Sequence, residues 1–269
     1  MNPPVDNLPS LEAVCKLAAK AAEAIMLVYA RDDFDVREKD DHSPLTAADL
    51  ASHRVIVEGL RALTPEIPVL SEESADIDWD TRRQWSRYWL VDPLDGTREF
   101  LKRNGEFTVN VALIDNHASV MGVVLVPVTG DLYAASVNHG AFVRKHGAGQ
   151  TTLRTRKPAA PLVVAGSRSH ASERQLALLS GLGEYTKIPM GSSLKFCLIA
   201  DGQADLYLRA GPTSEWDTAA AQCVLEQAGG AVMQLDGVPL AYNTKASLLN
   251  PEFLAVGDAT RDWPGQLSS

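Results

Sequence analysis

Residues 89–97 read Trp-Leu-Val-Asp-Pro-Leu-Asp-Gly-Thr, and the rest of the chain is organised around this stretch. Its apolar beginning predicts the end of a buried strand, and Pro93 and Gly96 are expected to turn the chain out of that strand within a few residues. Asp92 and Asp95 should therefore converge at the strand end. Two ionised carboxylates this close repel each other unless a cation lies between them, and their oxygens suit Mg²⁺ or Ca²⁺.

The end of the same stretch favours an anion. Gly96 and Thr97 offer backbone N–H groups, because residues 98–102 can begin a short helix. A cation beside an anion-binding turn suggests a phosphate held by a metal ion. The alternative is a simple Asp-Gly turn in which Asp92 only ends a strand, and the motif alone does not decide between the two.

Composition and charge bound the class of protein. The chain has 269 residues, of which 45% are hydrophobic and 22% charged, as expected for a globular protein with a sizeable core. We expect two lobes, residues 1–155 and 156–269, joined by a Gly-, Lys- and Pro-rich crossing at 145–161. A net charge of −9 argues against binding to a nucleic-acid polymer. Cys15, Cys197 and Cys223 match no zinc motif and are expected to be buried free thiols.

The N-terminal sequence has no signal-peptide pattern, and no apolar window is long enough to span a bilayer. We therefore expect a cytoplasmic protein without a transmembrane segment. The sequence leaves open a peripheral association with the cytoplasmic face of the inner membrane. It also leaves open whether the active form is a monomer or a homodimer.

In the first lobe, apolar periodicity predicts two helices followed by a largely antiparallel sheet. The first helix covers 10–30 with Ser10 as its N-cap, and the second begins at a Thr46/Asp49 capping pair. The apolar face of the second helix is expected to comprise Leu50, His53, Ile56, Val57, Leu60 and Leu63. The expected strands are 68–71, which ends at Glu72 and Glu73, and 107–114, 120–126, 132–135 and 141–143.

In the second lobe, strands that open into polar loops alternate with helices, as in α/β folds. The strand at 162–165 leads through the polar loop 166–170, which contains His170, to a helix with Leu176, Leu178 and Leu179. The hydroxyl-rich loop Gly191-Ser192-Ser193 precedes a helix that ends near Gly202. A strand at 204–209 ends at Arg209, and a helix at 215–226 begins beside Asp217 and stops at two glycines.

Each candidate site residue also has a purely structural interpretation. Asp49 and Asp217 suit helix starts whether or not they take part in chemistry. The Glu72-Glu73 pair is typical of a solvated loop. Lys195 could be a surface residue and Ser192 or Ser193 a helix cap, or the same loop could hold a phosphate or a ribose.

Each of these candidate residues lies at the end of a strand or the start of a helix, and such positions come together at one edge of an α/β structure. Glu72, Asp92, Asp95 and Asp217 would suffice for a pair of Mg²⁺ ions bridged by Asp92. Thr97 and Asp49 would complete a proton path.

Four of these motifs resemble, in order and spacing, the metal-dependent, lithium-sensitive phosphatases of the inositol monophosphatase superfamily. They are residues 92–97, the Glu72-Glu73 pair, the segment 46–49 and the segment Trp216-Asp217-Thr218-Ala219-Ala220. Segments 39–44, 98–100, 103–110 and 191–197 resemble the bacterial 3'(2'),5'-bisphosphate nucleotidases of that superfamily. The resemblance extends from about residue 39 to residue 251.

The resemblance implies an α/β fold, with an α+β N-terminal lobe and an α/β C-terminal lobe stacked as a layered αβαβα sandwich. It implies two or three Mg²⁺ ions and hydrolysis of adenosine 3',5'-bisphosphate to AMP and phosphate, in the setting of sulfate assimilation. Hydrolysis of the 3'-phosphate of the corresponding phosphosulfate is a further expected activity.

The family's site residues carry over to matching positions of this chain. Glu72, Asp92 and the Leu94 carbonyl would hold one ion, and Asp92, Asp95 and Asp217 the second. Asp49, Glu72 and Thr97 would orient and deprotonate the attacking water, and the N–H groups of Gly96 and Thr97 would take the scissile phosphate. The rest of a small nucleotide substrate would meet His170, Ser192, Lys195, Arg209 and Asp217.

Two other functions remain as alternatives. The first is the same chemistry on an inositol or fructose phosphate, against which the cations Lys195 and Arg209 argue, because a bisphosphate needs more positive charge. The second is a non-catalytic sensor of nucleotide or metal, which would not need the water-activating groups.

Overall fold

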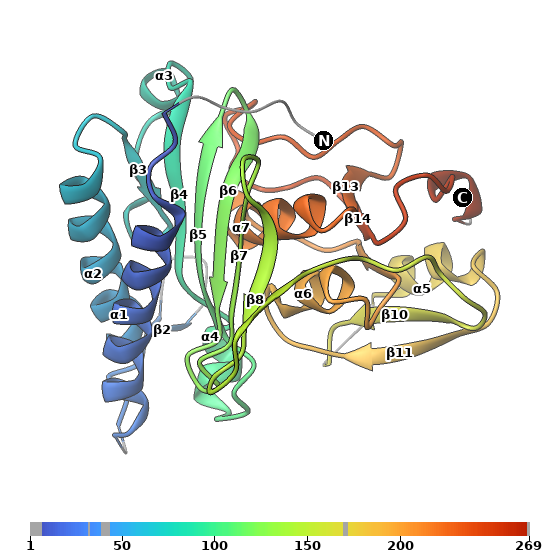
Figure 1. Cartoon of the computed structure of the whole chain (residues 1–269), viewed down its shortest axis with the longest axis horizontal. Coiled ribbons are helices and arrows are strands. Elements are labelled where there is room, and N and C mark those ends of the chain that lie inside the picture. Colours follow the sequence, from blue (N-terminus) through green and yellow to red (C-terminus); the bar gives the residue numbers. More distant parts are fainter. Residues whose placement is uncertain (1–6, 32, 39–43, 169–171, 268–269) are drawn as a thin grey trace.

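The computed structural model describes residues 7–31, 33–38, 44–168 and 172–267. Two large sheets alternate with three layers of helices, as Figure 1 shows. The structure is therefore the layered αβαβα sandwich expected from the sequence. None of the helices in the described residues is both long and apolar enough to cross a membrane.

The first sheet has seven strands in the order β3-β4-β5-β6-β7-β8-β9. β3 runs parallel to β4, and every other neighbouring pair is antiparallel. The strands are β3 Val69–Ser71, β4 Arg87–Asp95, β5 Thr108–Asp115, β6 Ala118–Leu125, β7 Leu132–Ser136, β8 Gly140–Arg144 and β9 Gln150–Thr152. The expected meander is confirmed, but β9 was expected to be part of an irregular crossing, because its residues are polar and exposed.

β4 continues beyond the point where the sequence predicted its end. The strand includes Pro93 and reaches Asp95, with a shift in register between Asp92 and Asp95. β3 pairs with β4 only as far as Val91, so one edge of β4 is free where proline occurs. A proline costs no ladder hydrogen bond at such a place.

Helices α1 (Leu11–Tyr29) and α2 (Ala47–Leu63) cover the outer face of this sheet (Figure 1). Both expected caps are present: the Ser10 hydroxyl accepts from Ala13 N–H at 3.3 Å, and Thr46 and Asp49 form a reciprocal capping box. The expected face of α2 was partly wrong, because Leu50 and His53 are only half-buried and Leu63 is 37% exposed. The buried face is shifted toward the polar residues that meet β4, and it comprises Ala48, Asp49, Ser52, Ile56, Val57 and Leu60.

Helices α6 (Leu194–Ala200) and α7 (Glu215–Gln227) lie between the two sheets. The second sheet has the order β11-β10-β12-β14-β13, with α5 (Glu173–Ser180) on its far side. Its strands are β10 Leu162–Gly166, β11 Tyr185–Pro189, β12 Leu206–Arg209, β13 Ala231–Gln234 and β14 Phe253–Val256. The sequence predicted β10 and β12 but not β11, β13 or β14.

Short elements complete the fold. They are the strands β1 (Arg37–Glu38) and β2 (Pro44–Leu45), the helices α3 (Trp79–Arg82) and α4 (Thr97–Leu101), and the 3₁₀ turns η1 (Glu72–Ser74) and η2 (Pro264–Gln266). α4 is the short helix expected after the Asp-Gly-Thr turn. The three cysteines are buried free thiols, as expected.

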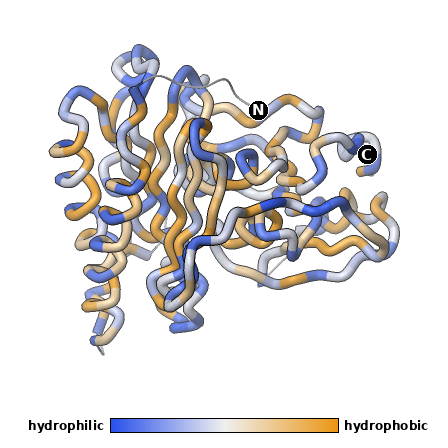
Figure 2. Tube along the Cα trace, viewed as in Figure 1, coloured by the Kyte–Doolittle hydropathy of each residue, from blue (hydrophilic) through white to orange (hydrophobic). Residues whose placement is uncertain are grey.

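Alternation of side chains along the strands builds three hydrophobic clusters. In β5, Val109, Val111 and Leu113 face α1 and α2, whereas Ala112 and Ile114 face α7. In β14, alternate residues belong to the inter-sheet cluster and to the cluster under α5. Figure 2 shows the hydrophobic colour concentrated along these inner strands. The expected lobe boundary at 155/156 remains a prediction, although the chain passes from one sheet to the other between β9 and β10.

Candidate active site

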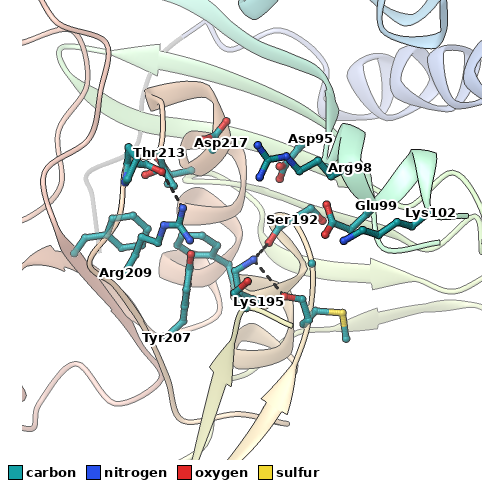
Figure 3. A pocket seen from close by; sticks show the side chains of 18 residues that line it. Asp95, Arg98, Glu99, Lys102, Ser192, Lys195, Tyr207, Arg209, Thr213 and Asp217 are labelled. Atoms are coloured by element: carbon teal, nitrogen blue, oxygen red, sulfur yellow. Dashed lines mark hydrogen bonds between the residues drawn. The ribbon is translucent and has the colours of Figure 1, made fainter. Parts of the chain in front are cut away.

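A cavity of about 490 Å³ lies where the end of β4, the start of α4 and the loops before α6 and α7 meet. Figure 3 shows Asp95 and Asp217 on one side of this cavity and Lys195, Tyr207 and Arg209 on the other. Arg98 of α4 and Lys102, the residue that follows this helix, also line the cavity. The cavity thus joins an acidic half to a basic half.

The acidic half contains three carboxylates from distant parts of the chain. One oxygen from each of Asp92, Asp95 and Asp217 lies within 4.8 Å of the other two. β4 carries the first two and the first turn of α7 carries the third. Asp217 also accepts from Ser214 N–H at 2.8 Å, so its capping role and its place in the cluster coexist.

Two carboxyl groups of this cluster have raised pKa values. Burial, together with Glu72, Asp95 and Asp217, raises the pKa of Asp92 well above its usual range. Burial and Asp95 raise the pKa of Asp217 to about 8. Carboxyl groups so placed resist ionisation unless a cation neutralises them, and an all-oxygen donor set suits Mg²⁺. The residues therefore fit the metal that the sequence predicted.

Glu72 and Leu94 adjoin this cluster. Glu72 begins η1 directly after β3, and its carboxyl group raises the pKa of the neighbouring Asp92. Leu94 N–H donates to Asp92 Oδ1 at 3.0 Å, which fixes the orientation of that carboxylate. Glu72 and the Leu94 carbonyl remain predicted ligands of the first ion.

Asp49 contacts Thr97 across the gap between α2 and α4. Its Oδ2 accepts from Thr46 N–H at 2.8 Å and from the Thr46 hydroxyl at 2.5 Å, while its Oδ1 accepts from the Thr97 hydroxyl at 3.4 Å. The cap therefore uses one oxygen and leaves the other toward Thr97. Structural and catalytic interpretations of Asp49 are compatible, because the two roles use different oxygens.

In the basic half, Lys195 is buried rather than exposed. Only 7% of the residue is accessible, and its ammonium donates to the carbonyls of Met190 and Ser192. It also lies 5.1 Å from the centre of the Tyr207 ring. Burial lowers its pKa to about 8. The interpretation of Lys195 as a surface residue was wrong.

Arg209 ends β12 on the same wall of the cavity. Its Nε donates to the Gly211 carbonyl at 3.2 Å and its terminal nitrogen to the Pro212 carbonyl at 2.9 Å. Gly96 and Ser192 also line the cavity, and Ser192 Oγ is buried without a hydrogen-bond partner in the described chain. His170 lies outside the described residues.

Sequence reasoning missed the part played by Ser193. Its N–H and hydroxyl donate to Asp95 Oδ2 at 2.7 and 2.6 Å, and Asn110 Nδ2 donates to its hydroxyl at 2.7 Å. Ser193 precedes α6 but makes no side-chain cap there, so the capping alternative does not apply to it. The hydroxyl-rich loop was the only sequence signal for this contact.

Comparison with known proteins places the chain in a family. Residues 6–260 match the model of the inositol monophosphatase family, and the chain belongs to that family.

Among its relatives is the 3'(2'),5'-bisphosphate nucleotidase CysQ of Escherichia coli K12, 51% identical over 90% of this chain and 98% of that protein. CysQ of Aggregatibacter actinomycetemcomitans is 39% identical over 97% of each chain. The crystal structure of CysQ from Bacteroides thetaiotaomicron matches 94% of this chain and 97% of that chain, with a TM-score of 0.79 and 39% identity.

Proposed function

We propose that this chain is a Mg²⁺-dependent 3'(2'),5'-bisphosphate nucleotidase that hydrolyses the 3'-phosphate of adenosine 3',5'-bisphosphate to AMP and phosphate. The observation that carries the proposal is one cavity with clustered carboxylates on one wall and cations on the other. The likeness to the CysQ proteins over nearly the full length of both chains supports the same substrate.

The acidic half would hold the metal. Asp92, Asp95 and Asp217, with Glu72 and the Leu94 carbonyl, would bind two or three Mg²⁺ ions. Bound Mg²⁺ would neutralise charge on the scissile phosphate and lower the pKa of the attacking water. In the same region, the Thr97 hydroxyl would orient that water and pass its proton to Asp49 Oδ1, with Glu72 as the second acceptor.

The turn at Gly96 and the basic half would bind the substrate. The N–H groups of Gly96 and Thr97 would hold the scissile phosphate as water attacks phosphorus and the bond to the 3'-oxygen breaks. Lys195, Arg209 and Ser192, together with His170, would hold the second phosphate and the nucleoside. Phe196, Tyr207 and Phe253 pack against one another beside these groups, and all three are buried, so they support the basic half from the core side.

The test is phosphate release from adenosine 3',5'-bisphosphate, inositol 1-phosphate and fructose 1,6-bisphosphate, each with Mg²⁺ and with EDTA. We expect Mg²⁺-dependent turnover that strongly favours the adenosine bisphosphate. Preference for a sugar phosphate would overturn the nucleotide assignment while keeping the chemistry. Nucleotide binding without any turnover would overturn the enzymatic assignment.

A further inference from the structure

Glu106 lies beside the cavity but belongs to none of the groups assigned so far. It precedes β5, and its side chain is 15% exposed. Its carboxylate joins two loops of the other sheet: Oε2 accepts from Gly191 N–H at 2.9 Å, and both oxygens accept from the Arg168 guanidinium. One carboxylate therefore links the first sheet to the loops that follow β10 and β11.

Two glycines also pack closely against the backbone of Glu106. A Cβ added to Gly191 would lie 2.7 Å from the Glu106 carbonyl oxygen, and one added to Gly96 would lie 3.2 Å from the same atom. Glycine at both positions allows the Asp95-Gly96-Thr97 turn and the loop before α6 to approach Glu106 from two sides.

The loop tethered in this way is strained and carries the groups that face the substrate. Ser192 adopts a φ of 43°, which is uncommon for a residue with a side chain and persists only where neighbours enforce it. Its carbonyl accepts from the Lys195 ammonium, and the next residue holds Asp95. Two hydrogen bonds fix the start of this turn: Met190 N–H donates to the Gly166 carbonyl at 2.9 Å, and Gly191 N–H donates to Glu106.

We propose that Glu106 is a positioning residue that sets the place of the Gly191-Ser192 turn, and with it the affinity for the second phosphate of the substrate. Gly191 N–H is the essential contact. Arg168 is half-exposed and orients the carboxylate. This inference rests on the proposed function for its substrate, but the tether itself can be observed without turnover.

The expected kinetic signature is a change in KM without a matching change in kcat. The contacts of Asp95 with Ser193 and Asn110 do not involve Glu106, so we expect them to persist in the variant and to hold the reacting phosphate as before. Glu106→Ala should raise KM for adenosine 3',5'-bisphosphate by about tenfold or more and leave kcat within about twofold. Hydrolysis of p-nitrophenyl phosphate, which lacks a second phosphate, should hardly change.

Two milder variants separate the two contacts. Glu106→Gln keeps an acceptor for Gly191 N–H but loses the charge that pairs with Arg168, and Arg168→Ala keeps the carboxylate but loses the guanidinium. Each should raise KM by no more than about threefold, as expected for a partly exposed ion pair. If Arg168→Ala raised KM as much as Glu106→Ala, the arginine itself would contact the substrate and the proposal would be wrong.

The chain provides a matched control for the pair formed by Glu106 and Arg168. Arg174 and Glu252 form a similar two-point pair, with distances of 2.6 and 2.7 Å, and neither residue lines the cavity. Glu252→Ala removes the same chemical group, so it measures the effect of losing such a pair on stability alone. We expect it to leave KM and kcat unchanged for both substrates.

Amide hydrogen exchange in the absence of substrate completes the test. Glu106→Ala should accelerate exchange in peptides that contain Gly191, and Glu252→Ala should not. If wild type fails to hydrolyse the bisphosphate but this acceleration occurs, the proposed function is wrong and the tether stands. If wild type is active while Glu106→Ala changes neither KM nor exchange, the tether is wrong and the function stands.

Discussion

The charged groups in the two halves of the cavity differ in whether the protein supplies partners for them. In the acidic half, burial and neighbouring carboxylates raise the pKa of Asp92 and Asp217. In the basic half, backbone carbonyls accept from Lys195 and Arg209. The carboxylates therefore repel one another until a cation arrives, whereas these two cations already have partners. Replacing a charged side chain by a neutral one should therefore stabilise the metal-free protein when the residue lies in the acidic half, and destabilise it when the residue lies in the basic half.

The largest expected effect tests the acidic half. Asp92→Asn should lower turnover of every phosphate substrate by about three orders of magnitude, because a proposed metal ligand and its charge are lost. The same change should raise Tm in EDTA, at about 2 to 4 °C per kcal/mol of relieved repulsion for a chain of this size. Calorimetry in EDTA and phosphate release with Mg²⁺ measure the two effects.

Asp115→Asn is the control for this substitution. Asp115 is also a buried aspartate of the first sheet, but Arg87 Nε donates to it at 2.8 Å. Its neutralisation should lower Tm and leave turnover nearly unchanged, since it removes one partner of an ion pair. A fall in Tm for Asp92→Asn as large as that for Asp115→Asn would contradict the contrast between the two halves.

The second effect tests the basic half. Lys195→Met should raise KM for adenosine 3',5'-bisphosphate by about 10- to 100-fold, because a charge-assisted contact to the second phosphate is lost. KM for p-nitrophenyl phosphate should stay close to that of wild type. Lys20→Met, on the exposed side of α1, controls for the loss of one positive charge. Equal losses on both substrates would show that Lys195 serves the reacting phosphate instead.

A smaller effect concerns pH. Burial lowers the pKa of Lys195 to about 8, against the opposing influence of Asp95, Glu99 and Asp217, while Arg209 lowers it further. Lys195 is thus charged below about pH 8 and loses its proton as pH rises through that value. Affinity for the second phosphate should fall in the same range, because the attraction of the ammonium is lost.

The ratio of kcat/KM for adenosine 3',5'-bisphosphate to that for p-nitrophenyl phosphate isolates this titration, since it cancels events at the shared reacting phosphate and reports the free enzyme. The ratio should be level near pH 7 and decline above pH 8 in wild type. In Lys195→Met it should show no such decline. A decline that persists in the variant would assign the titration to another group.

The sequence could predict those contacts that form between near neighbours. The Ser10 cap and the capping boxes at Asp49 and Asp217 span three residues, so their partners are visible in the sequence. The meander of β5 to β8 was equally predictable, because each of these strands is apolar and pairs with the next one along the chain.

The remainder depends on pairing between distant segments. β11, β13 and β14 are fixed by partners elsewhere in the second sheet, and β11 is too polar and exposed to show an apolar pattern. Ser193 and Asp95 are 98 residues apart, so no local pattern shows that they bond. The candidate carboxylate ligands followed from their residue types at strand ends and helix starts, and the family resemblance assigned them to individual ions. The groups that orient them required the structure.

The smallest effect separates the two kinds of cation that line the cavity. The side chains of Arg98 and Lys102 line the cavity, but neither makes a hydrogen bond or ion pair with any residue that the structure describes. Because both are exposed, water screens their attraction for an anion, in contrast to buried Lys195. Arg98→Gln should therefore raise KM for the bisphosphate by only about two- to fivefold and reduce its dependence on salt. Arg54→Gln removes the same charge from the exposed face of α2 and should change neither quantity. A loss for Arg98→Gln as large as that for Lys195→Met would contradict this contrast, because α4 would then contribute as much as α6 to binding the second phosphate.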